Sequence, residues 1–74
     1  MSPAPSRRPS VGRVASFDAH RGWGTVIGTD GAEYGFHATA IADGTRRIDP
    51  GTDVAFVVTP GHRGLYEAQG LVRL

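Results

Sequence analysis

Apolar and polar residues alternate along five short stretches of this chain, and glycine, proline or aspartate separates one stretch from the next. A period of two is typical of strands that bury one face, because successive side chains of a strand point to opposite sides. No 3.6-residue period persists over ten residues, so the pattern predicts an all-β protein. The predicted strands cover residues 11 to 18, 22 to 28, 32 to 37, 52 to 60 and 65 to 73.

The segments between these strands set their order. Tight turns at residues 20 to 22 and at Asp30-Gly31 connect the first three strands, and the glycine in the second turn adopts a positive φ without penalty. A loop over residues 60 to 64 connects the last two strands. The longer link over residues 38 to 51 begins with one predicted helical turn at residues 38 to 41. This order predicts a five-stranded antiparallel barrel, closed or nearly closed, which leaves no exposed sheet edge.

The alternation also predicts which side chains fill the barrel. A barrel of five strands is filled by its own side chains, so a ligand has to bind on the outside. The predicted interior residues are Val14, Val26, Tyr34, Phe36, Ile41, Val54, Phe56, Val58 and Leu71.

Residues 1 to 10 differ in composition from the rest of the chain. They contain three of the five prolines and no large apolar residue beyond the first methionine. This composition is typical of a disordered tail, so we expect a tail over residues 1 to 10 and one domain over residues 11 to 74. A domain of this length has a thin core and little room for an enclosed active site.

The positive charges of the chain are all arginines, eight in number, and there is neither lysine nor cysteine. Arg7 and Arg8 lie in the predicted tail, which leaves residues 11 to 74 with a net charge of about −1 when histidine is neutral. Tight nonspecific binding to a polyanion needs an excess of positive charge. A local patch would have to supply it here. Without cysteine, the chain has no disulfide framework and no thiolate metal site.

Several functional classes find no support in the sequence. No apolar run approaches the ~18 to 20 residues that span a bilayer, and no hydrophobic signal segment follows the N-terminal arginines, so we expect a cytoplasmic protein with no membrane partner. The three histidines lack the spacing of metal ligands. No nucleophile or phosphate-binding loop accompanies them, so we expect no enzymatic activity, no metal and no cofactor.

One segment, Arg21-Gly22-Trp23-Gly24-Thr25-Val26, indicates a ligand-binding face. On a strand, Trp23 and Thr25 point to one side while Gly24 and Val26 point to the other. An aromatic ring beside an arginine is suited to a flat ligand, and stacking of one nucleic-acid base on such a ring contributes ~1–3 kcal/mol.

Four segments stand out by their order and spacing: residues 12 to 24, residues 36 to 41, residues 50 to 56 and the hairpin loop over residues 61 to 64. Together they resemble the cold-shock domain, a five-stranded oligonucleotide-binding barrel (OB-fold). The first resembles the opening strand and first ribonucleoprotein motif of that family, and the second resembles its second motif. The resemblance extends from Gly12 to Leu74.

The resemblance implies binding of single-stranded RNA or DNA and melting of RNA secondary structure, as in an RNA chaperone or a regulator of transcription or translation. Members of the family usually carry a tryptophan at the place of Ser16 and phenylalanines at the places of Thr25, Gly35 and Ala38. With fewer rings to stack on, we expect binding weaker than that of typical members.

The candidate nucleic-acid-binding residues fall into two groups. Trp23 and His37 are expected to stack on bases, and Phe17 either joins them or closes one end of the barrel; Thr25 occupies the second stacking position without a ring. Since rings do most of the binding, we expect some preference for pyrimidine-rich strands and a marked salt dependence. The candidate phosphate contacts are Arg13, Arg21, Arg46, Arg47 and Arg63.

A second hypothesis comes from the small residues on the same face. With small residues at Ser16, Thr25, Gly35 and Ala38, the outer face of the barrel is smooth and nearly neutral. Such a surface can bind another protein or a second copy of the same chain. In that case the domain is a protein-interaction or self-associating barrel that no longer binds nucleic acid. For the nucleic-acid-binding hypothesis we expect a monomer, with a homodimer as the alternative.

Overall fold

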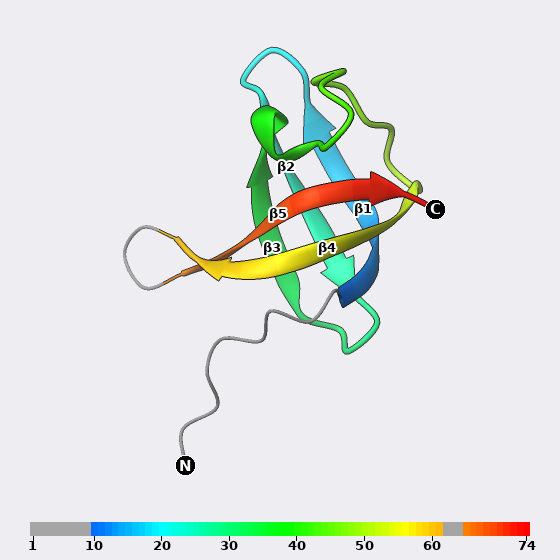
Figure 1. Cartoon of the computed structure of the whole chain (residues 1–74), viewed down its shortest axis with the longest axis vertical. Helices are drawn as coiled ribbons and strands as arrows, with labels where there is room; N and C mark the ends of the chain where they lie inside the picture. The colour runs from blue at the N-terminus through cyan, green and yellow to red at the C-terminus, as the bar shows by residue number, and fades with distance from the viewer. Residues whose placement is uncertain (1–9, 62–64) are drawn as a thin grey trace.

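The structure is a computed structural model that describes residues 10–61 and 65–74, and it is built of strands. Each of the five predicted strands is confirmed to within one residue at either end, and the predicted helical turn is a short 3₁₀ helix, η1. Figure 1 shows their arrangement. The elements are β1 (Ser10–Asp18), β2 (Trp23–Gly28), β3 (Glu33–His37), η1 (Ala38–Ala40), β4 (Asp53–Pro60) and β5 (Tyr66–Arg73).

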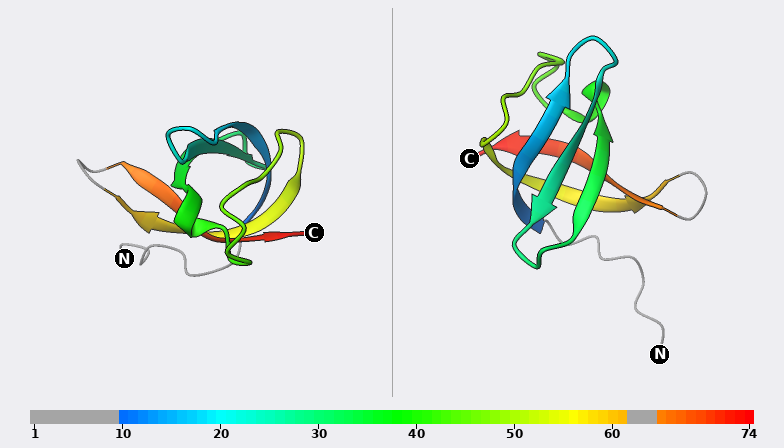
Figure 2. Two further views of the ribbon diagram at one scale, coloured as in Figure 1. Left: turned by 90° about the horizontal axis from the view of Figure 1, so that it is seen from above. Right: turned by 180° about the vertical axis from the view of Figure 1, so that it is seen from behind.

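The five strands close into a barrel in the order β1-β2-β3-β5-β4, with β4 pairing back to β1. Seen from above, the strands surround a common interior (Figure 2). The closed, all-β barrel is consistent with the OB-fold expected from the sequence. The expectation of an antiparallel barrel needs one correction, because β3 and β5 run parallel where Gly35 pairs with Glu67. A ring with an odd number of strands cannot alternate in direction throughout, so one neighbouring pair has to be parallel.

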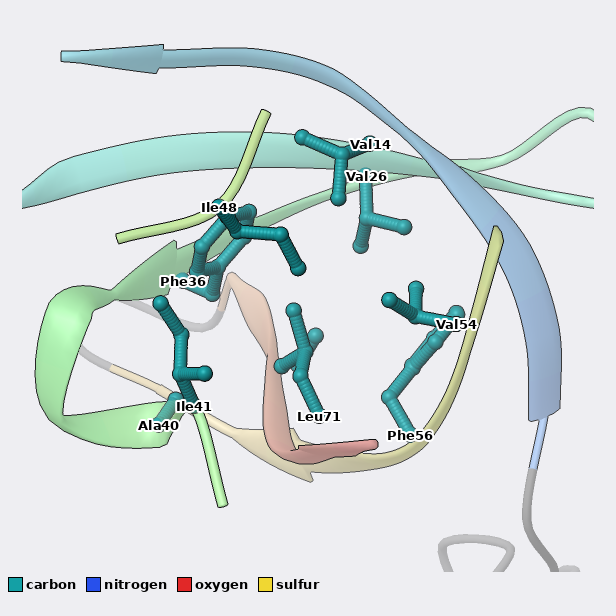
Figure 3. Packing of buried hydrophobic residues seen from close by; sticks show 10 residues of the cluster. Val14, Val26, Phe36, Ala40, Ile41, Ile48, Val54, Phe56 and Leu71 are labelled. Carbon is teal, nitrogen blue, oxygen red and sulfur yellow. The ribbon is translucent and has the colours of Figure 1, made fainter. Parts of the chain in front are cut away.

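The core consists of aliphatic and aromatic side chains that converge inside the barrel (Figure 3). Seven of the nine predicted interior residues are buried, whereas Tyr34 and Val58 are half-buried and pack against the others. Three further buried hydrophobic residues were not predicted: Ala40 in η1, Ile48 in the link and Ala68 in β5. Ile48 lies outside any strand, so the alternation of residues gave no signal for it. The full set is Val14, Val26, Phe36, Ala40, Ile41, Ile48, Val54, Phe56, Ala68 and Leu71.

The predicted turn between the second and third strands is confirmed. Gly31 has φ of +85°, the left-handed conformation that glycine adopts at low cost. The Asp30 carboxylate accepts a hydrogen bond of 3.0 Å from the backbone N–H of Ala32 and holds the turn. Across residues 10–61 and 65–74, the structure contains no helix that is long and apolar enough to cross a membrane.

Candidate nucleic-acid interface

Trp23 begins β2 and points outward, with 37% of its surface exposed. Its indole reaches diagonally across to β3 and covers Gly35. A Cβ atom built on Gly35 would overlap Cζ2 of the indole and lie 2.9 Å from Cη2. The bare backbone of Gly35 is therefore the seat of the indole edge that carries Cζ2 and Cη2, and 37% of the Trp23 surface remains exposed.

His37 lies directly across from Trp23 in the β2–β3 pairing. The two ring centroids are 4.5 Å apart and the ring planes meet at 76°. Such an edge-to-face arrangement is favourable for aromatic pairs. It forms a corner in which a flat ligand stacked on the indole meets the imidazole along one edge.

The next position along the strand is polar and carries no ring. Thr25 pairs with Gly35 on one side and with Ser16 on the other. The hydroxyl oxygens of Ser16 and Thr25 are 2.8 Å apart, so one hydroxyl donates a hydrogen bond to the other. The surface at Thr25 therefore offers a donor and acceptor pair and no aromatic ring.

Phe17 does not join Trp23. A bulge between Val14 and Ser16 shifts the register of β1, so that Phe17 lies opposite Gly24, on the inner face. Its ring stacks on that of Phe36, with centroids 5.8 Å apart and planes within 9°. Phe17 is half-buried against the core, which matches the second of the two roles considered for it, closure of the barrel.

Two of the candidate phosphate contacts each lie beside a carboxylate. Nε of Arg21 is 3.8 Å from Asp18, and Nε of Arg13 forms a 3.0 Å ion pair with Asp53. Both pairs are largely exposed to solvent, so they are weak. Arg21 is two residues from Trp23, whereas Arg13 lies opposite Ile27, at the other end of β2.

Two acidic residues lie beside the Trp23 corner, and the alternation of residues did not place them there. Asp18 pairs with Trp23, and Glu67 pairs with Gly35. Asp18 and Glu67 lie near Trp23 only because of how neighbouring strands pair, and this register cannot be inferred from alternation along one strand. The surroundings of the indole therefore carry no excess of positive charge.

The link between η1 and β4 is fastened to β5 by Arg73. Its guanidinium donates to the carboxylate of Asp43, to the hydroxyl of Thr45 at 3.3 Å and to the backbone carbonyl of Arg47. The backbone N–H and the hydroxyl of Thr45 also donate to Asp43, at 3.0 and 2.8 Å. These bonds from Thr45, followed by the nearby Arg73, hold the pKa of Asp43 below its ordinary value.

The remaining candidate arginines lie away from the indole or outside the described residues. Arg46 and Arg47 are exposed on the link, and Arg46 has the left-handed φ of +58°. Arg63 lies outside the described residues. Within residues 10–61 and 65–74, no group of three or more His, Asp or Glu side chains is placed to hold a metal ion. No model of a known protein family matches the chain.

Proposed function

We propose that this domain binds single-stranded nucleic acid by stacking one base on the exposed face of Trp23. The observation that carries the proposal is the corner formed by Trp23 and His37, in which the indole is seated on Gly35 and remains partly exposed. The closed five-stranded barrel and the resemblance to the cold-shock domain support the same function. Family members act on single strands, and RNA chaperone activity or regulation of transcription or translation would follow from such binding.

Each neighbour of the indole has a role in this proposal. His37 contacts the edge of the stacked base, and the paired hydroxyls of Ser16 and Thr25 bond to polar groups of the next nucleotide. Arg21 is the nearest of the described arginines along the chain, and its side chain is 83% exposed, so it is free to meet a phosphate. Stacking of one base provides ~1–3 kcal/mol, which corresponds to weak binding.

The charges around the corner change the expected salt dependence. For a single strand, the logarithm of affinity falls with that of salt concentration by about 0.7 for each phosphate neutralised. Arg13 and Arg21 each lie beside a carboxylate, and Asp18 and Glu67 border the indole. We therefore expect a shallow dependence, with a slope of about −1, in place of the marked dependence inferred from the sequence.

A titration of a labelled thymine-rich strand at low salt tests the proposal through fluorescence anisotropy. Trp23→Ala removes the stacking surface and should weaken binding by about 5- to 150-fold. Trp23→Phe keeps a ring and should retain most of the affinity. Ile27→Ala is the matched control, because Ile27 lies on the same strand and face but four residues away. Equal affinities for the wild-type chain and Trp23→Ala would contradict the proposal.

A further inference from the structure

A second exposed surface lies on the outside of β2, β1, β4 and β5, at the end of β2 away from Trp23. Arg13 pairs with Ile27 on one side and Asp53 on the other, and the N–H of Leu74 donates to the carbonyl of Asp53 at 3.0 Å. One row across four neighbouring strand positions is therefore apolar, positive, negative and apolar. This row consists of Ile27, Arg13, Asp53 and Leu74.

A second row lies beside the first and is mostly apolar. Val11 pairs with Ala55, and Ala55 pairs with Val72 on the next strand. Val11 and Val72 are each about half exposed, at 45% and 52%, and Leu74 is exposed to 72%. These exposed aliphatic side chains surround one ion pair, and together they form a candidate interaction surface.

We propose that these two rows form the interface of a homodimer. A two-fold axis relates the two copies and runs parallel to the strands at Arg13 and Asp53. The axis lies in the interface and passes between Arg13 and Asp53. A two-fold interface presents the same patch twice, so residue i contacts residue j and residue j contacts residue i. In the first row, this symmetry places Arg13 over Asp53 and Ile27 over Leu74, so that charges of opposite sign meet and apolar side chains meet. A second copy of the chain is therefore the partner that fits this row.

The charges match under this symmetry. Arg13 of each copy lies over Asp53 of the other, so that the two exposed ion pairs become one network of four alternating charges. Each guanidinium can then bond to two carboxylates, and apolar residues exclude water from the network. A two-fold axis across the strands would instead place Arg13 over Arg13, which is repulsive.

The shapes match as well. Val11, Arg13 and Ile27 border a shallow hollow on the β1–β2 side of the patch. The proposed symmetry places Leu74 of the second copy, the most exposed apolar side chain of the row, over Ile27 and this hollow. Trp23 is four residues from Ile27 along β2, about 13 Å away. The indole therefore remains free in the dimer, and this inference does not depend on the proposed function.

Sedimentation velocity of the full chain, from low to high micromolar concentration, tests the inference. The patch is small compared with stable interfaces, so we expect reversible dimerisation that becomes evident only at the upper concentrations. Arg13→Asp places two carboxylates of each copy over two of the other, and Asp53→Arg places guanidiniums over guanidiniums. Each variant alone should dimerise at least ~10-fold more weakly than the wild-type chain.

Mixing the two variants provides the decisive comparison. In an equimolar mixture, the carboxylates of Arg13→Asp lie over the guanidiniums of Asp53→Arg, so a heterodimer should form at concentrations where neither variant dimerises alone. A defect in folding would not be repaired by mixing. If a single reversal unfolds the chain, Leu74→Glu tests the same surface from its most exposed position, and the double reversal keeps both charges paired and should dimerise. A wild-type chain that stays monomeric at all concentrations, or a dimer that both Leu74→Glu and Arg13→Asp leave intact, would overturn the inference.

Discussion

At the scale of single residues, the contact between Trp23 and Gly35 determines what the outer face can bind. The edge of the indole is fixed against the bare backbone of the glycine, and 37% of the Trp23 surface is exposed. A larger residue at position 35 would occupy the same space as the ring. The indole of Trp23 beside His37 is therefore the aromatic surface at this end of the β2–β3 pair.

The substitution Gly35→Ala tests this seat. The added methyl group would overlap the indole, so the ring has to move away from β3 and from His37. We expect a shift of the Trp23 fluorescence maximum and roughly tenfold weaker binding of a thymine-rich strand, within the contribution of one stacked base.

A double-mutant comparison separates this effect from a general effect on the strand. When Trp23→Ala has already removed the ring, Gly35→Ala should leave the free energy of unfolding unchanged or raise it slightly, because alanine loses less backbone freedom than glycine on folding. If Gly35→Ala lowered the free energy of unfolding equally with and without the Trp23 ring, the contact between Trp23 and Gly35 would have no role.

Alternation along the strands was sufficient to predict that Trp23 points outward and Val26 inward. It was not sufficient for Phe17, because one extra residue in the bulge of β1 exchanges the two faces beyond it. It also missed the diagonal contact between Trp23 and Gly35, since a diagonal neighbour is known only when the register between strands is known.

At the scale of elements, the strands and the helical turn were predictable, and the rest of the link was not. Three of the strands end at Asp18, Gly28 and Pro60, which are residue types that disfavour the strand conformation locally. The bonds from Arg73 to the link join residues 26 to 30 positions apart in the chain. Ile48 is buried among core residues from several strands. Contacts between segments so far apart cannot be predicted from the order of neighbouring residues.

The bonds to Asp43 predict how the stability of this link depends on pH. The pKa of the folded carboxyl lies below its ordinary value of 3.8, so the carboxylate stabilises the fold above that pH, and the contribution is lost as the pH falls through the folded pKa. Asp43→Asn should therefore lower the free energy of unfolding at neutral pH and have little effect in strong acid.

Urea denaturation at neutral pH and in acid measures the free energy of unfolding of the wild-type chain and of Asp43→Asn under the two conditions. Asp49→Asn is the matched control on the same link, because Asp49 bonds to Thr52 through its backbone carbonyl. A loss of stability for Asp43→Asn that is equal at neutral and acidic pH would show that the charge of Asp43 is not responsible.

At the scale of the whole molecule, the closed barrel separates two outer surfaces. The corner of Trp23 and His37 lies at one end of the β2–β3 pair, and the rows around Arg13 and Asp53 lie beyond the other end of β2. The ring is closed, but among the described strands residues 16 to 18 of β1 pair only with β2, and residues 57 to 60 of β4 pair only with β5. The two surfaces lie far enough apart that changes at one should leave the other unaffected.

The most direct test of the central claim is an amide-shift map of the labelled protein during titration with a short thymine-rich strand at low salt. We expect the indole N–H of Trp23 and the amides of residues 23 to 25 and 35 to 37 to shift together along one binding curve, while the amides of Val72 and Leu74 remain in place. A map in which these Trp23 and β3 signals do not move up to high-micromolar strand concentration would contradict the claim that this corner binds nucleic acid.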